Sequence, residues 1–355
     1  MTHTKNRAPK APFLTRIFHT PLKSRTGYRV GRLPAGASAQ AGALRCAPLP
    51  GWRMLALALL ACLAPLRSYG QAQVARSALA FQTANGGEFT FDTGLLRGKL
   101  RPQGKALGLC SVVYLPTGQQ LDKGGGGPGL FSHYRVFTSN HRYGVGAWDW
   151  PSTASLQADG SVQVRWPAQE GRPFAMEAHY RWIRPDELEL ETVVQAHQNL
   201  SGFESFLASY FQDDFTNALV CGTSAQGQTK TPVLLALEQR FGDWQMFPRD
   251  AAALELIQDG RWQLPPNPVA WNTNRPLGAP IAARSAPASG VTVVLSSSAR
   301  DCFAIAGPHQ TDAHHSLYLS LFGRDIPAGT TARARARLYV GARLSNAQIL
   351  AAAAQ

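Results

Sequence analysis

The chain has 355 residues, with 35 Lys and Arg, 22 Asp and Glu and a formal net charge of +13. Residues 1–70 hold 11 of the basic residues and no acidic one, which leaves 24 basic and 22 acidic residues, a net of +2, in 71–355. Because most of the chain is nearly neutral, the composition excludes the broad basic surface that is typical of nucleic-acid-binding proteins. We therefore expect no nucleic-acid partner.

The N-terminal part of the chain predicts export. Residues 1–53 are basic, rich in Pro, Ser and Gly, and lack a hydrophobic period, so we expect an unstructured leader. Met54–Leu66 follows as an apolar run of 13 residues. This length is too short for a membrane span and is typical of the hydrophobic part of a signal peptide, with cleavage expected near Gly70 or Ala72.

These features predict three segments: the leader 1–53, the signal segment 54–71 and one β-sandwich domain over 72–355. The mature protein is then periplasmic or extracellular and has no transmembrane span after signal removal. A second, lower-ranked alternative is lipidation of Cys62, because Leu59–Cys62 resembles a lipoprotein cleavage site.

Cysteine usage in the predicted domain indicates no metal centre. Cys110, Cys221 and Cys302 have no close spacing, and each lies in a strand-like apolar stretch. We expect buried free thiols, although an oxidising compartment also permits one disulfide among them.

Alternation of apolar and polar residues predicts antiparallel hairpins. Asp159–Gly160 is a tight-turn dipeptide inside the alternating segment 155–166. Residues 174–182 and 188–196 alternate on either side of a turn at 184–187, which predicts a hairpin with one buried face.

The C-terminal third of the sequence adds two short helices and an outer strand. Asp250 is a capping-type residue before the apolar stripe of 251–257, and 345–355 has helical composition. In 331–340, three arginines alternate with small apolar residues, and we interpret them as the solvated face of a strand rather than an anion site.

The fold class that follows is all-β: a large antiparallel two-sheet supersandwich with one short helix near 250–258 and a candidate helix at the C-terminus. The sequence resembles the galactose mutarotase-like β-supersandwich superfamily in Gly129–Phe137, Arg142–Gly144, the hairpin around Asp186 and Asp325–Thr330. The resemblance implies a carbohydrate-active fold, found in aldose epimerases and beside many glycoside hydrolases and polysaccharide lyases. The epimerases' Asn-His-x-Tyr-type segment is missing, so their catalytic acid and base are not assigned here.

The densest polar and aromatic stretch, 132–150, is the candidate saccharide site. His133 and Arg135 alternate with Tyr134, so we expect them on one sheet face. If 148–150 is a strand, Trp148 and Trp150 lie on one side, where indoles suit a sugar ring, although both are also ordinary core residues. The candidates for substrate binding are Arg135, Arg142, Tyr143, Trp148, Trp150, Arg261 and Trp262.

Carboxylates complete any acid–base chemistry on a sugar. Glu204 lies in an apolar strand-like run and is expected either to meet a basic partner or to face a pocket, and Asp214 follows that run. The candidates for catalysis are His133, His141, Glu204 and Asp214. Asp250 fits a helix cap better than a catalyst, and Asp259 and Arg261 fit a turn pair.

No cofactor motif is found, and we expect no cofactor. Asp312, His314 and His315 contain metal-ligating atoms, but adjacent histidines on a strand point in opposite directions, so we expect no transition metal there.

Three functions stay open. The first is an exported protein that binds or modifies carbohydrate; if it epimerises a sugar, His133 or His141 serves as the acid and Glu204 or Asp214 as the base. The second is a lyase-type enzyme in which Tyr143 or His141 is the base and Arg135 or Arg142 neutralises a uronate. The third is a non-catalytic envelope module that binds glycan or protein. The expected ligand is a saccharide, and the oligomeric state stays open.

Overall fold

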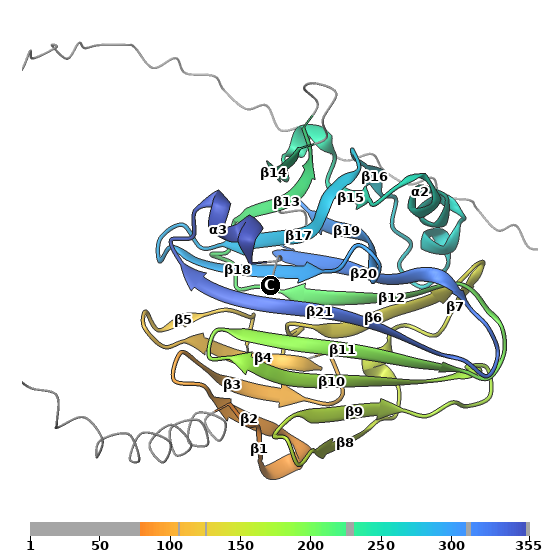
Figure 1. Ribbon diagram of the computed structural model, residues 1–355, viewed down its shortest axis with the longest axis horizontal. Coiled ribbons are helices and arrows are strands. Elements are labelled where there is room, and N and C mark those ends of the chain that lie inside the picture. The colour runs from red at the N-terminus through yellow and green to blue at the C-terminus, as the bar shows by residue number, and fades with distance from the viewer. Residues whose placement is uncertain (1–78, 106, 125, 225–230, 310–313, 353–355) are drawn as a thin grey trace, which may run out of the picture. The chain divides into compact units, whose positions relative to one another are not determined.

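The computed structural model describes residues 79–105, 107–124, 126–224, 231–309 and 314–352, all within the unit Leu60–Gln355. The predicted leader, the signal segment and Cys62 lie outside these residues. The strands of the described chain form three sheets (Figure 1).

The five-stranded sheet comes first in the chain, and the strands of the two larger sheets alternate along the rest of it. The five-stranded sheet has the spatial order β1 (Gln82–Thr83), β2 (Phe89–Asp92), β3 (Leu96–Arg101), β4 (Gly108–Tyr114), β5 (Gln119–Gln120). The nine-stranded sheet has the order β14 (Pro232–Ala236), β13 (Asn217–Thr223), β17 (Leu277–Ser285), β18 (Val291–Ser297), β21 (Thr331–Ala342), β11 (Glu187–Ala196), β10 (Phe174–Arg184), β9 (Val162–Trp166), β8 (Thr153–Leu156). The seven-stranded sheet has the order β16 (Asn272–Thr273), β15 (Trp244–Pro248), β19 (Cys302–Pro308), β20 (Ser316–Ile326), β12 (Leu200–Tyr210), β6 (Ser132–Thr138), β7 (His141–Arg142).

The all-β prediction and both hairpins are confirmed. Strands β10 and β11 pair antiparallel with Met176 opposite Val194, and β8 pairs with β9 across the turn at Gly160, whose φ is +80°. The five-stranded sheet is an addition to the expected two sheets. It packs on the nine-stranded sheet through Phe91, whose ring centroid lies 4.7 Å from that of Trp182.

The two larger sheets face each other. His133 of β6 contacts Thr192 of β11, with 2.9 Å between the imidazole Nε2 and the hydroxyl. In the register of the seven-stranded sheet, His133 lies opposite Leu207 of β12, so these two side chains share the face turned toward the nine-stranded sheet. Residues that alternate with Leu207, such as Phe206, lie on the outward face.

Helices and short 3₁₀ turns lie at the sheet margins. Helix α2 (Ala251–Gln258) begins at Asp250, whose carboxylate accepts a hydrogen bond from the Ala253 amide at 2.9 Å, as predicted for a cap. Helix α3 (Asn346–Ala351) packs Ile349 against Ile281 and Val294 of the nine-stranded sheet. The 3₁₀ turns are η1 (Asn85–Gly87), η2 (Ala147–Asp149), η3 (Gln239–Phe241) and η4 (Arg261–Gln263).

The arginine stripe of β21 lies on the outer face, as expected from the sequence. The side chains of Arg333 and Arg335 are 58% and 62% exposed, and both contact the carboxylate of Glu191 on β11. Cross-strand pairing therefore supplies the partners of these arginines.

The three cysteines of the described chain are free and buried, as predicted. Burial raises the pKa of the Cys110 thiol to about 11 and that of Cys302 to about 12. Within the described residues, no helix is long and apolar enough to cross a membrane.

Candidate functional site

A cleft of about 510 Å³ lies on the outward face of the seven-stranded sheet, and we call it the aromatic cleft. Its volume is in the range typical of small-ligand sites, about 300–1,000 Å³. Its seven aromatic side chains come from four strands, a 3₁₀ turn and a loop: Tyr134 (β6), Phe206 and Tyr210 (β12), Tyr318 (β20), Trp244 (β15), Trp262 (η4) and Trp271. Arg135, His314 and loop residues 267–270 complete the lining.

A β-bulge brings Arg135 to this cleft. In the pairing of β6 with β12, Val136 lies opposite Ser205 and His133 lies opposite Leu207, so Tyr134 and Arg135 together face Phe206 alone. A bulge of this kind re-aims a side chain. Arg135 therefore shares the outward face with Tyr134, and the expectation that it shares a face with His133 was wrong.

The aromatic rings hold one another in place. The rings of Phe206 and Tyr318 stack with centroids 4.6 Å apart and an angle of 18°. Trp262 meets Phe206 edge-on at 4.7 Å and Trp271 at 5.2 Å. Such edge-to-face and offset contacts are favourable ring geometries. The floor and one wall of the cleft are therefore a connected set of rings.

Tyr134 is supported from outside the cleft by Trp148. The two rings stack at 4.1 Å with an angle of 14°. Trp148 lies in η2, not in a strand, and is 5% exposed. It therefore supports the wall of the cleft instead of lining it.

Arg135 is the charged group of the cleft. It is 5% exposed, and its Nη2 donates to the carbonyl of Asn267 at 2.8 Å. Its guanidinium carbon lies 5.1 Å from the ring centroid of Tyr134 and 5.4 Å from that of Trp262. Nε and Nη1 have no hydrogen-bond partner in the described part of the chain. A buried donor without an acceptor costs about 1–3 kcal/mol, and more where the group is charged.

A chain of hydroxyl groups runs along the floor. Ser316 Oγ donates to Tyr318 Oη at 2.8 Å, and Tyr318 Oη donates to Tyr210 Oη at 3.4 Å. Burial raises the pKa of both tyrosines above the ordinary value of 10. These phenols are therefore neutral near pH 7 and act as hydrogen-bonding groups.

A buried arginine holds the chain that carries His314. Arg284 of β17 donates to the carbonyls of Phe215 and Pro308 and contacts Nδ1 of His315 at 3.3 Å. Burial lowers the pKa of Arg284 to about 10, so the group stays charged near neutral pH. With His315 held on Arg284, His314 points the other way and lines the cleft.

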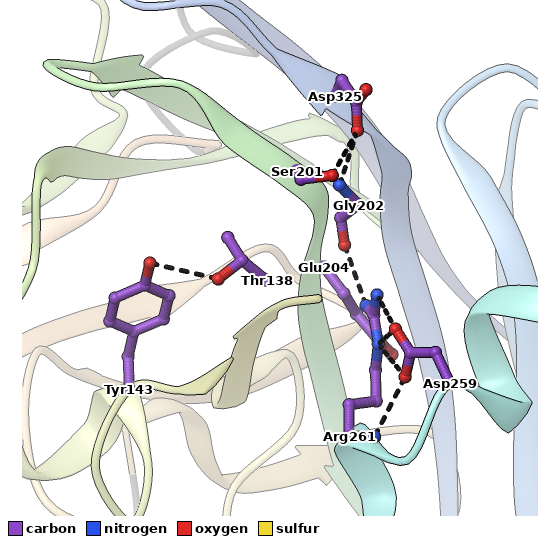
Figure 2. Close-up of polar contacts among 8 residues, drawn as sticks. All are labelled: Thr138, Tyr143, Ser201, Gly202, Glu204, Asp259, Arg261 and Asp325. Atoms are coloured by element: carbon purple, nitrogen blue, oxygen red, sulfur yellow. Dashed lines mark hydrogen bonds and ion pairs between the residues drawn. The ribbon is translucent and has the colours of Figure 1, made fainter. Parts of the chain in front are cut away.

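A buried ion-pair network fixes the turn that carries Trp262 (Figure 2). Arg261 is fully buried and donates to Glu204 at 3.1 Å, to Asp259 at 2.8 Å and to the Gly202 carbonyl at 2.9 Å. Burial raises the pKa of the Glu204 carboxyl, and the Arg261 charge opposes that rise. The sequence predicted that Glu204 either pairs with a basic residue or faces a pocket, and the structure shows the pairing, with Arg261.

Several predicted site residues lie outside the cleft. His133 is fully buried between the sheets, and burial lowers its pKa to about 3. Asp214 is exposed and accepts a hydrogen bond from Gln119 of the five-stranded sheet at 2.8 Å. Trp150 packs under Arg172, whose guanidinium carbon lies 4.0 Å from an indole ring centroid.

The β7 residues form a neighbouring structural cluster. His141 is exposed and meets the ring of Tyr143 at 4.4 Å, and the Tyr143 hydroxyl contacts Thr138 at 3.3 Å (Figure 2). Arg142 donates to carbonyls of Gly144, Val145 and Pro266. It thereby ties the loop after η4 to β7. Of the eleven predicted site residues, Arg135 and Trp262 line the cleft.

Sequence reasoning missed most of the cleft rings. Trp244, Trp271 and Tyr318 were not among the predicted site residues, and His314 was considered only as a metal ligand. A signal was present in β12, where Glu204, Phe206 and Tyr210 follow one face in steps of two. That face combines charge with large rings, whereas the alternating positions are Ser205, Leu207 and Ser209.

A second hollow of about 400 Å³ lies beside β20 and β21 and is lined by Arg300, Arg324 and Arg333. Arg324 donates to the carbonyls of Arg300 and Arg333, and Arg333 pairs with Glu191. Two of its three arginines thus have protein partners, so this hollow is the weaker candidate.

Some solved structures are similar to this chain at low sequence identity. The sequence matches no protein-family model and no curated protein. Similar solved structures include a galactose mutarotase related enzyme from Lactobacillus acidophilus, with 10% identity, a TM-score of 0.44, and coverage of 73% of this chain and 99% of that one. A galactose mutarotase-like protein from Lactobacillus casei has 10% identity, a TM-score of 0.45, and coverage of 72% and 100%. An aldose epimerase homologue from C. elegans has 10% identity, a TM-score of 0.41, and coverage of 74% and 98%. These three neighbours are described as galactose mutarotase-like or aldose epimerase proteins, each at 10% identity and a TM-score under 0.5.

Proposed function

We propose that this protein binds a saccharide in the aromatic cleft. The observation that carries the proposal is a cavity of about 510 Å³ lined by seven aromatic rings, six of which contact one another, with hydrogen-bonding groups of Tyr210, Tyr318 and Asn267 among them. The apolar C–H face of a sugar ring packs on aromatic rings, while its hydroxyls need polar partners. The cleft offers both kinds of surface.

The same geometry favours binding over aldose-epimerase chemistry. An epimerase-type reaction needs a base at the anomeric proton, and no carboxylate lines the cleft among the described residues. Glu204 is committed to Arg261, and Asp214 is exposed and bonded to Gln119. The predicted base is therefore not available where the ligand would lie, and a binding protein is the simpler proposal.

Calorimetric titration of the full-length chain with neutral and acidic mono- and oligosaccharides tests this proposal, with NMR of the same mixtures to detect turnover. Trp271→Ala removes a half-buried ring of the cleft and should weaken binding about fivefold or more, because interface aromatics commonly contribute above about 1 kcal/mol. Phe241→Ala is the matched control, since this ring is 38% exposed and lies outside the cleft. Failure of every saccharide to bind, or equal loss in both variants, would refute the proposal.

We propose in addition that the protein is exported and works in the periplasm or outside the cell. The support is the apolar run Met54–Leu66 between a basic leader and small polar residues. Expression of the full-length chain in a Gram-negative host, followed by N-terminal sequencing, tests this. We expect a mature N-terminus near Gly70 or Ala72, and an intact N-terminus in the cytoplasmic fraction would refute it.

A further inference from the structure

We infer that the ligand of the aromatic cleft is an acidic saccharide, whose carboxylate or sulfate group binds Arg135. This inference rests on the proposed saccharide site and specifies its substrate class. It is supported by the set of unpartnered N–H donors in the cleft and by the positive charge of Arg135 and Arg142.

The first observation is the state of the Arg135 side chain. The guanidinium lines the cleft, is 5% exposed and uses Nη2 on the Asn267 carbonyl. Nε and Nη1, which carry three N–H groups, have no partner in the described residues. Planar guanidinium groups match the two oxygens of a carboxylate or the oxygens of a sulfate, and such charge-assisted bonds are the strong ones.

The second observation is that the cleft is rich in donors. Besides Arg135, the indole N–H groups of Trp262 and Trp271 are buried and have no acceptor within the described chain. Indole and guanidinium nitrogens donate only, so a ligand group that pairs with them must accept hydrogen bonds. An ionised carboxylate or sulfate is a pure acceptor, whereas a neutral sugar hydroxyl brings a proton of its own.

The third observation is the positive charge around Arg135. No ion pair joins Arg135 or Arg142 to a carboxylate among the described residues, and both donate to backbone carbonyls. Arg135 donates to the Asn267 carbonyl and Arg142 to that of Pro266, the preceding residue, so the two side chains reach the same turn of the loop. Burial, together with the Arg135 charge, lowers the pKa of Arg142. A negative group of the ligand would balance the positive charge of these two arginines, whereas a neutral ligand would not.

The experiment compares an acidic oligosaccharide with its neutral ester and adds a sulfated sugar as a second anionic ligand. The full-length protein is titrated with trigalacturonate, with its methyl ester, which is neutral and nearly isosteric, and with a sulfated galactotriose. We expect the free acid or the sulfated sugar to bind at least tenfold more tightly than the ester. The acid and sulfate arms identify which anionic group the cleft takes.

Arg135→Gln should then lower affinity for the preferred acidic ligand about 10- to 100-fold and change that for the ester little, in line with hydrogen bonds to charged groups. Arg97→Gln, an exposed arginine of β3, is the matched control and should change neither affinity. Circular dichroism checks that both variants fold, and the comparison of acid with ester on the unaltered chain needs no variant.

The outcomes separate the two proposals. Equal binding of ester and acids overturns the acidic specificity and leaves the saccharide site intact. Unchanged acid preference in Arg135→Gln overturns the assignment to Arg135. Absence of binding by neutral and acidic saccharides alike overturns the saccharide site itself.

Discussion

Replacement of Arg261 by Met tests the network that anchors the cleft wall. Arg261 and Glu204 are 0% and 1% exposed at their side chains, and their charges meet at 3.1 Å (Figure 2). Arg261→Met leaves the Glu204 carboxylate buried without its cation, which costs about 3–5 kcal/mol of the free energy of unfolding. With an m-value of about 3 kcal/mol/M, the urea midpoint should fall by about 1 M or more.

The partners of Arg261 predict an asymmetry between the two ends of this pair. In Glu204→Gln, the Arg261 guanidinium keeps Asp259 and the Gly202 carbonyl, so the loss should be smaller, about 1–2 kcal/mol. The double variant Glu204→Gln with Arg261→Met should be more stable than Arg261→Met alone, because the uncompensated charge is gone. Arg97→Met, whose side chain is 64% exposed, serves as control and should cost under about 0.5 kcal/mol.

The pH dependence of Arg261→Met follows from the raised pKa of Glu204. Burial places the folded-state pKa above the ordinary value of 4.5, and removing the Arg261 charge raises it further. Below 4.5 the carboxyl is protonated in both the folded and the unfolded chain, so the cost of burying its charge disappears. The destabilisation should therefore grow as the pH rises from 4 to 7. A loss under about 1 kcal/mol at neutral pH, or a loss no larger than that of Glu204→Gln, would refute the reasoning.

Two further predictions concern the core and α2. His133 has a pKa lowered to about 3 from 6.5 by burial, so its neutral form stabilises the fold above 6.5 and this contribution is lost as the pH falls toward 3. His133→Gln should reduce the slope of unfolding free energy against pH between 6 and 4 by about 1.4 kcal/mol per pH unit, measured by urea unfolding with His179→Gln as control; an unchanged slope would exclude a neutral buried imidazole. Asp250→Ala removes the cap of α2 and should cost about 1 kcal/mol in the same assay, whereas Asp250→Asn should restore most of it; no difference between the two would show that the cap is not needed.

Local patterns were enough for the two predicted hairpins and their buried faces. Hairpin β10–β11 follows from alternation of apolar and polar residues, and the turn at Asp159–Gly160 from a dipeptide whose glycine takes a positive φ. The cap at Asp250 and the buried free cysteines were predicted in the same way. Turns and caps depend on neighbours within a few residues along the chain, and buried strand faces depend on the alternation of apolar residues. Both patterns can be recognised in the amino-acid sequence.

The cleft depends on contacts that alternation does not encode. Strict alternation places Arg135 with His133, but the bulge opposite Phe206 turns Arg135 to the other face. This bulge is a property of the register between β6 and β12, about 70 residues apart in the chain. The alternation within β6 alone therefore predicted the wrong sheet face for Arg135.

The sequence by itself determined an all-β chain, a basic segment over 1–70, a nearly neutral remainder and an aromatic, polar stretch at 132–150. The tertiary structure decided which side chains share a site. Arg135, Trp262, Trp271 and Tyr318 line one cleft, whereas His133 and Glu204 are buried against Thr192 and Arg261. The physical reason is range. Periodicity reports which face of a strand is buried, whereas a binding site is made by strands paired over long separations, and the pairing follows from packing of the whole core.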